Sequence, residues 1–179
     1  MNKTTVVLEE VIRAAATGQP KARETLVAEV RRPLFAYLYR LTRQAETAED
    51  LLQDVLFILC TKAETFTPGR RFWPWAYAIA RNRFLEWKRQ ESRIVRLHQA
   101  ARPVMPPVVH PQADADRRLD IARVLDGLSL DVRETFVLKH FQGLTFNEVA
   151  EVQGIPVPTA KSRVLFALRK LQAALGAPA

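Results

Sequence analysis

The chain has 179 residues, 48% of them hydrophobic and 26% charged, and these proportions exclude a chain that is disordered throughout. Its 27 Lys and Arg residues outnumber 19 Asp and Glu, and the net charge of +8 favours a polyanionic partner, nucleic acid before anionic lipid. The one cysteine, Cys60, excludes a disulfide framework and fits a cytoplasmic location, and without a signal-peptide pattern or a long apolar run we expect no membrane insertion.

Helical periodicity dominates the first part of the chain. No segment alternates at the period of two that is typical of strands, so we expect an all-α fold. Apolar residues at helical spacing predict helices over about 4–16 and 21–32. Pro33 fits the first position of a separate helix, 33–43, because a proline there loses no intrahelical hydrogen bond.

The next segment begins with a helix start signal. Thr47, followed three residues later by Asp50, is a variant of the capping box and predicts a helix over 47–63. A Pro-Gly turn signal predicts a loop over 64–71, and a long helix of about 72–93 follows it.

A proline-rich stretch, 101–114, divides the chain. Such a run resists helix formation and cannot build a core, so we expect an extended linker between two helical domains. Periodicity predicts four helices after it, at about 115–127, 131–141, 145–153 and 158–175.

The last two of these helices have the pattern of a helix-turn-helix unit, in which Gly154 supplies the tight turn. Pro158 fits the first position of the second helix, which makes Val157 its N-cap residue. On a helical wheel one side of this helix is apolar and faces the core: Ala160, Val164, Ala167, Leu168, Leu171 and Leu175.

The opposite side of the last helix has the composition of a DNA-reading surface. It presents Ser162, Leu165, Phe166 and Arg169, with Lys161, Arg163 and Lys170 beside them. Early exposed residues of such a helix meet base edges in the major groove, while basic neighbours bind phosphates. The alternative is a helical hairpin packed on another subunit, with a solvated basic face.

The long helix carries two aromatic faces, where a core needs one. Phe72, Trp75, Ile79 and Trp87 form the first, and Trp73, Tyr77 and Phe84 form the second, beside Arg81 and Lys88. The second face suits a platform on which unpaired bases stack; alternatively, it packs on the N-terminal helices. On the preceding helix, an acidic edge of Glu49, Asp50, Gln53 and Asp54 is either a solvated face or a docking surface for a basic partner.

In their order and spacing these segments resemble the extracytoplasmic-function sigma factors, the small two-domain sigma factors of bacterial RNA polymerase. The resemblance is carried by 47-TAEDLLQDVLFIL-59, 72-FWPWAYAIARNRFLEWKR-89, the proline-rich stretch and 125-LDGLSLDVRETFVLKHFQGLTFNEVAEVQGIPVPTAKSRVLFALRKL-171. It implies an N-terminal domain over 1–95 for polymerase docking and promoter melting, a linker over 96–117, and a C-terminal helix-turn-helix domain over 118–179.

The resemblance also implies roles for particular residues. Those that match the polymerase-docking segment are Asp50, Leu51, Gln53, Asp54 and Phe57. The residues expected at the melted promoter strand include two rings of the aromatic platform and are Arg70, Arg71, Trp73, Tyr77, Arg81, Asn82, Lys88 and Arg89. Those expected to read or flank the distal promoter element are Thr159, Lys161, Ser162, Arg163, Leu165, Phe166 and Arg169.

The expected function is therefore that of an alternative sigma factor, with core RNA polymerase and promoter DNA as partners and an anti-sigma factor as a further candidate. Scattered histidines and the absence of a Gly-rich phosphate loop predict neither an enzyme nor a cofactor or metal site. Two other classes of protein stay open: a helix-turn-helix regulator that never touches polymerase, and a sigma-like decoy that binds an anti-sigma factor.

Overall fold

The computed structural model describes residues 3–67, 69–99 and 116–175, which are helical with no strand among them, so the all-α prediction is confirmed for this part of the chain. The N-terminal helices are α1 (Lys3–Ala16), α2 (Pro20–Thr42), α3 (Ala45–Thr61) and α4 (Phe72–Gln99), with a 3-10 turn at Ala63–Thr65. The C-terminal helices are α5 (Asp116–Asp126), α6 (Leu130–Phe136), which continues as a π-helical turn over Val137–Phe141, α7 (Phe146–Gln153) and α8 (Val157–Leu175). The predicted proline-rich linker, 101–114, lies outside the described residues.

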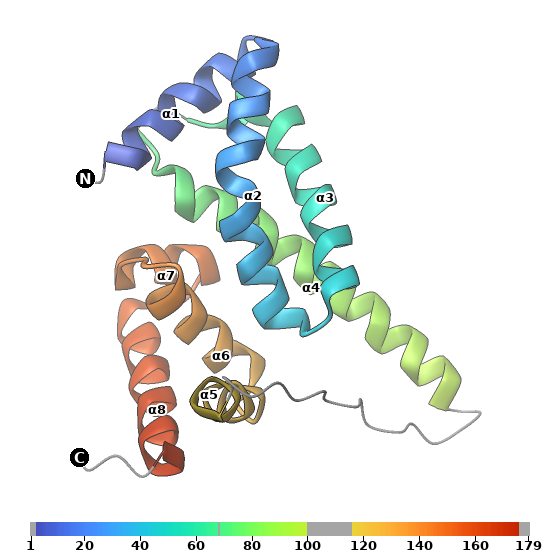
Figure 1. Ribbon diagram of the computed structural model, residues 1–179, viewed down its shortest axis with the longest axis vertical. Coiled ribbons are helices and arrows are strands. Elements are labelled where there is room, and N and C mark those ends of the chain that lie inside the picture. The colour runs from blue at the N-terminus through green and yellow to red at the C-terminus, as the bar shows by residue number, and fades with distance from the viewer. Residues whose placement is uncertain (1–2, 68, 100–115, 176–179) are drawn as a thin grey trace.

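The two groups of helices pack against each other. Figure 1 shows α5–α8 beside α2 and α4, with α3 on the far side of α2 from α6–α8. The main core joins apolar side chains of the N-terminal helices, such as Leu34 and Phe72, to Val137, Leu138 and Val149 of the C-terminal ones. A smaller core lies within the C-terminal domain and contains Leu125, Leu128, Phe136, Ala167 and Leu171. The domains therefore share an apolar contact in addition to the covalent connection.

Helix α2 is one continuous helix, so the prediction of separate helices on either side of Pro33 was wrong. A proline inside a helix costs about 3 kcal/mol, because it removes a hydrogen bond and crowds the preceding turn. Burying a leucine or valine side chain contributes about 1.5–3 kcal/mol. Buried Leu26 and Val30 precede Pro33, and Leu34 and Leu38 follow it along the same face. Packing on both sides of the proline therefore outweighs the local penalty.

The predicted capping box at the start of α3 does not form. The helix begins at Ala45, two residues early, with Gln44 as its N-cap residue. The Thr47 hydroxyl donates to the Gln44 side-chain oxygen at 2.9 Å instead of accepting from the backbone amide of Asp50. A complete capping box does form at α7, where the Thr145 hydroxyl accepts from the Glu148 amide and the Glu148 carboxylate accepts from the Thr145 amide.

The helix-turn-helix unit is present, and the turn between α7 and α8 has the predicted glycine. Gly154 adopts φ 65°, and its amide donates to the carbonyls of Ala150 and Glu151 at the end of α7. The start of α8 differs from prediction, since the helix begins at Val157 and Pro158 is its second residue. The Pro156 carbonyl accepts from the amides of Thr159 and Ala160. These two amides are therefore already satisfied within the protein.

The conformation of Gly154 leads to a stability prediction. Nothing lies within 4 Å of a Cβ added there, so Gly154→Ala costs only the strain of a left-handed backbone, about 1–2 kcal/mol. Gly127→Ala is the matched control, because Gly127 has no positive φ and its Cβ would meet only ordinary contacts. Urea unfolding of both variants checks this, and an equal stability of the two would contradict the assigned turn.

Candidate nucleic-acid interface

Helix α8 has the orientation that the helical wheel predicts. Ala160, Val164, Ala167 and Leu171 are buried, and Leu168 is half-buried. On the other side Leu165 and Phe166 are 49% and 48% exposed, which is high for large apolar side chains. The polar residues exposed beside them are Lys161, Ser162, Arg169 and Lys170, while Thr159 and Arg163 are half-buried. A surface of apolar and cationic side chains on the second helix of this unit suits base edges and phosphates.

Arg163 differs from its neighbours on α8. Its guanidinium donates to the Asp131 carboxylate of α6 at 3.2 Å, so it ties α8 to the rest of the domain. The Lys170 ammonium, in contrast, lies 5.7 Å from the centre of the Phe166 ring, and its side chain remains exposed to solvent.

The acidic edge of α3 is exposed on the N-terminal domain except at Glu49, which is half-buried and pairs with Arg31 of α2. Asp50, Gln53 and Asp54 are exposed, and Phe57 is 70% exposed, the most of any large apolar side chain described. Leu51 is buried in the core, so its own side chain supports the helix from within. Asp54 pairs with Arg83 of α4, and together with Phe57 they line a hollow between the two helices. An apolar ring beside carboxylates forms a small surface suited to a basic partner.

The second aromatic face of α4 is largely covered, by α2 and by the C-terminal domain. Tyr77 and Phe84 are buried, and the Tyr77 ring meets Tyr37 of α2 edge-on at 5.2 Å. The Tyr77 hydroxyl donates to the Gln142 side-chain oxygen of the C-terminal domain at 2.7 Å. Burial raises the pKa of Tyr77, so it remains a neutral donor. Trp73 is half-buried and stacks on the Tyr77 ring at 5.6 Å.

The basic residues expected at the melted strand do not lie on one surface. Arg70, Arg71 and Arg81 face the C-terminal domain and pair with its carboxylates. Asn82 lines the hollow beside Phe57, on another side of α4. Further along the helix, Lys88 and Arg89 lie together around a separate depression.

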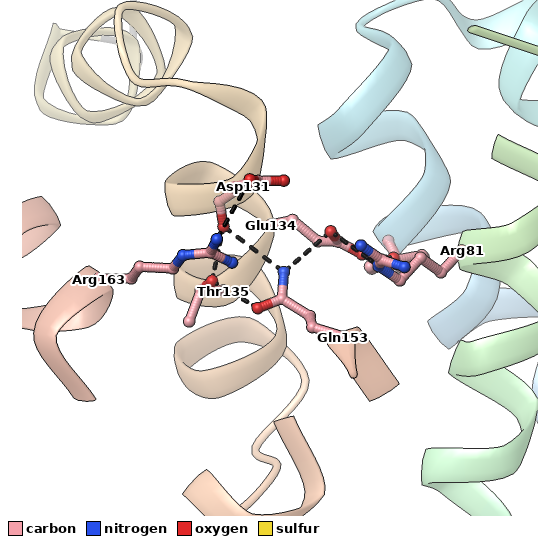
Figure 2. Close-up of polar contacts among 7 residues, drawn as sticks. Arg81, Asp131, Glu134, Thr135, Gln153 and Arg163 are labelled. Carbon is pink, nitrogen blue, oxygen red and sulfur yellow. Dashed lines mark hydrogen bonds and ion pairs between the residues drawn. The ribbon is translucent and has the colours of Figure 1, made fainter. Parts of the chain in front are cut away.

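Glu134 of α6 stands at the centre of the contact between the domains. Its side chain is 1% exposed and accepts hydrogen bonds from three side chains of three other helices. The Tyr37 hydroxyl donates at 2.7 Å, the Arg81 Nε lies 3.1 Å from the carboxylate, and the Gln153 amide donates at 2.9 Å. Figure 2 shows Arg81 reaching Glu134 from one side while Gln153 approaches it from the other. Burial, followed by the charge of Glu134, raises the pKa of Tyr37, so its proton is held for this bond.

The same network continues within the C-terminal domain. The Thr135 hydroxyl donates to the Gln153 side-chain oxygen at 2.7 Å, which fixes the Gln153 amide so that its nitrogen points at Glu134 (Figure 2). That nitrogen also lies 3.5 Å from the Asp131 carbonyl. Each member of this buried cluster therefore has a partner, which a low-dielectric site requires.

Helix α7 contributes two more carboxylates to the contact. Glu148 accepts from Arg71 at 2.7 Å, and Glu151 accepts from Arg70 at 3.3 Å. Burial alone would raise the pKa of Glu148, but hydrogen bonds from Arg71 and Thr145 hold that pKa below its usual value. Glu148 thus caps its own helix and binds the other domain with one side chain.

Sequence reasoning missed these partners, although a signal existed. Every acidic residue of the C-terminal half precedes position 152, and the basic helix α8 follows it. Asp126 is one of these acids; it pairs with Arg43 of the N-terminal domain at 2.8 Å and with Arg133 at 3.1 Å. This separation of charge along the sequence indicates one acidic and one basic face of the same small domain.

Among the described residues, no group of three His, Cys, Asp or Glu side chains is placed to hold a metal ion. None of the described helices is both long enough and apolar enough to cross a membrane.

Comparison with known proteins identifies the domains. Residues 26–94 match the Sigma-70 region 2 family, and residues 118–171 match the Sigma-70 region 4 family. The ECF RNA polymerase sigma factor EcfG of Rhodopseudomonas palustris is 30% identical over 145 residues, which cover 79% of this chain and 78% of that protein. The chain belongs to the extracytoplasmic-function sigma factors. The RNA polymerase sigma factor CarQ of Myxococcus xanthus is 29% identical to this sigma factor over 160 residues, covering 89% of this chain and 92% of CarQ.

A solved structure agrees with this sigma factor's fold. The sigma factor RpoE of Bartonella quintana, solved in complex with the anti-sigma factor NepR, superimposes with a TM-score of 0.76 and 29% sequence identity. The match covers 87% of this chain and 98% of RpoE. As a sigma factor, the chain binds core RNA polymerase and directs it to promoter DNA.

The Tyr37 hydroxyl allows a test of the buried network in this sigma factor. Tyr37→Phe keeps the ring and removes one of three donors to the Glu134 carboxylate, so we expect a loss of about 1.5–3 kcal/mol in the free energy of unfolding. Tyr39→Phe is the control, because the Tyr39 side chain is exposed and should lose almost nothing. Denaturant titration measures both, and equal values would remove Tyr37 from the network.

Proposed function

We propose that this sigma factor works through three separate surfaces. The edge of α3 around Phe57 docks on core polymerase, α8 reads the distal promoter element as duplex, and α4 with the preceding loop holds the melted strand. The observation that carries the proposal is the side of α8 on which Leu165 and Phe166 stand exposed among cations, on the second helix of a helix-turn-helix unit.

The reading surface combines two kinds of contact. Ser162, Leu165 and Phe166 are proposed to meet base edges, where an apolar side chain suits the thymine methyl group. The cations Lys161 and Arg169 are proposed to bind phosphates and so fix the register on the duplex. Thr159 and Arg163, which are half-buried, flank this surface at the start of the helix.

Strand capture is proposed for the N-terminal domain. Arg70, Arg71 and Arg81 supply cations for phosphates, while Trp73 and Tyr77 supply rings on which unpaired bases stack. Holding unpaired bases stabilises the melted state by mass action. Docking on polymerase brings the duplex-reading and strand-holding surfaces to one promoter, so two modest contacts act at high effective concentration.

The chain itself carries out no chemical step in this proposal, since the polymerase makes the RNA. Its place of action is then the cytoplasm, where polymerase and chromosome meet. A protein inhibitor is a further candidate partner, because the Bartonella relative was solved with the anti-sigma factor NepR.

Reconstituted transcription tests the proposal as a whole. Core polymerase with this chain should initiate RNA at specific start sites on genomic templates, and core polymerase alone should not. A regulator that never touches polymerase, or a decoy that only binds an anti-sigma factor, would give no specific transcript in this assay.

The docking surface leads to a binding prediction. Phe57→Ala removes an exposed ring that has no role in the core, so affinity for core polymerase should fall about ten- to a hundredfold with unchanged thermal stability. Asp50→Lys should also weaken binding, whereas Glu24→Lys, the same charge reversal at an exposed position of α2, should not. Equilibrium binding by fluorescence anisotropy measures all three, and an unchanged affinity for Phe57→Ala would place docking elsewhere.

Substitutions that remove the two kinds of contact on α8 should have different effects on DNA binding. Phe166→Ala should change which distal promoter sequences are used, at a cost of about 1–3 kcal/mol at one or two base positions. Lys161→Ala should weaken all promoters alike and reduce the salt dependence of binding by about one unit of slope. Selection from a randomised distal element at two salt concentrations separates these outcomes. An unaltered preference in the Phe166 variant would assign that ring to a protein contact.

A further inference from the structure

A pocket of about 680 Å³ lies where α5 and α6 pack beside α2, and none of the three proposed surfaces uses its residues. Its walls come from α2, from α5, and from α6 with the π-helical turn that follows it. Pockets that hold small organic ligands have volumes of about 300–1,000 Å³, with mostly apolar walls and a few polar groups. The size and position of this pocket therefore suit a small molecule that contacts both domains.

The side chains that line the pocket carry an excess of positive charge. A single carboxylate, Asp126, stands among four arginines: Arg32, Arg40, Arg43 and Arg133. Asp126 already pairs with Arg43 at 2.8 Å and with Arg133 at 3.1 Å. Because one carboxylate cannot balance four guanidinium groups, the pocket favours a ligand with several negative charges.

Arg133 has a hydrogen-bond donor to spare. Its Nε is buried and is the one buried side-chain nitrogen or oxygen in the described part of the chain that has no hydrogen-bond partner. Such donors are rare in folded proteins and point to a missing acceptor. Burial lowers the pKa of Arg133, and although the Asp126 charge raises this pKa, the Arg43 charge lowers it again. An anion in the pocket relieves this crowding of buried cations.

Aromatic rings form the remaining part of the pocket wall. The Tyr39 and Phe141 side chains are 42% and 43% exposed, and both line the pocket. The Tyr39 ring stacks on Phe35, with ring centres 6.0 Å apart and planes inclined by 12°. The Arg40 guanidinium lies over the Phe141 ring, 4.4 Å from its centre. Flat rings and guanidinium planes are surfaces against which a planar aromatic group stacks.

We propose that this pocket binds a nucleoside triphosphate, whose base stacks on Tyr39 or Phe141 and whose phosphates bind the arginines. A nucleotide joins in one small molecule the two features that the pocket selects, a planar ring and several negative charges. Guanidinium groups suit the phosphates because they bind phosphate oxygens in pairs.

The site is separate from the promoter-reading role and stands or falls independently of it, since its residues belong to none of the three proposed surfaces. A ligand that binds only the folded chain stabilises it by mass action. The stability of this sigma factor should therefore rise with the nucleotide concentration.

Arg32 allows a test that leaves the fold intact. Its side chain is exposed and makes no ion pair or hydrogen bond with another described residue. Arg32→Ala therefore removes a cation from the pocket and no contact within the protein. The control is Arg23→Ala, which removes the same charge from an exposed position of α2 outside the pocket. The probe is ATP with a fluorescent N-methylanthraniloyl group on the ribose, titrated into the full chain without polymerase or DNA.

We expect the unaltered chain and Arg23→Ala to bind the probe saturably at one site, and Arg32→Ala to bind it at least tenfold more weakly. Unlabelled ATP should displace the probe, inorganic triphosphate should need at least tenfold higher concentrations because it has no base, and adenosine should not displace it. Equal weakening by the two variants would show a general charge effect and overturn the proposal. Inorganic triphosphate as effective as ATP, or a lack of saturable binding, would overturn it as well.

Photolabelling locates the nucleotide on the unaltered chain, so this second test does not depend on how a variant folds. The chain is irradiated with 8-azido-ATP, and the labelled peptides are identified by mass spectrometry. Adducts should fall on peptides that contain Tyr39 or Phe141, and excess ATP should abolish them. Adducts confined to α8, or to the end of α4 around Lys88 and Arg89, would place the nucleotide on a DNA-binding surface and overturn the proposal.

Discussion

A buried carboxylate has to be partnered, and Glu134 meets this requirement by drawing side chains from both domains. An unpaired charge in the interior costs several kcal/mol, so a position with only 1% exposure is tolerated because Tyr37, Arg81 and Gln153 converge on it. Because these side chains come from α2, α4 and α7, their convergence fixes how the helix-turn-helix domain sits on the N-terminal helices. The burial of Tyr77 and Arg81, two of the residues proposed to hold the melted strand, depends on that placement.

The features that sequence reasoning predicts best are those with short-range causes. The apolar stripe of α8 follows from a period of 3.6 residues, so Ala160 and Val164 are assigned inward and Leu165 outward without tertiary information. Gly154 is predictable because few other residues accept its left-handed backbone. The family resemblance depends on the order and spacing of the same helices.

The features that sequence reasoning misses depend on tertiary contacts. Pro33 predicts a helix start by its local chemistry, yet Leu34 and Leu38 continue the buried face beyond it, and packing overrides the local preference. From the sequence alone, Tyr77 fits a base-stacking platform and a core position equally well, because a helical wheel does not show what packs against each face. Its contact with Gln142 spans 65 residues of sequence, and no local pattern encodes such a pairing.

The way the network divides between the domains bears on how readily they separate. When the C-terminal domain moves away, Glu134 loses Tyr37 and Arg81 but keeps Gln153, which Thr135 still orients within the same domain. The Arg70 and Arg71 side chains are 44% and 57% exposed, and ion pairs of exposed side chains contribute about 0–1 kcal/mol in water. The apolar contact through Val137, Leu138 and Val149 therefore opposes opening more strongly than these ion pairs do.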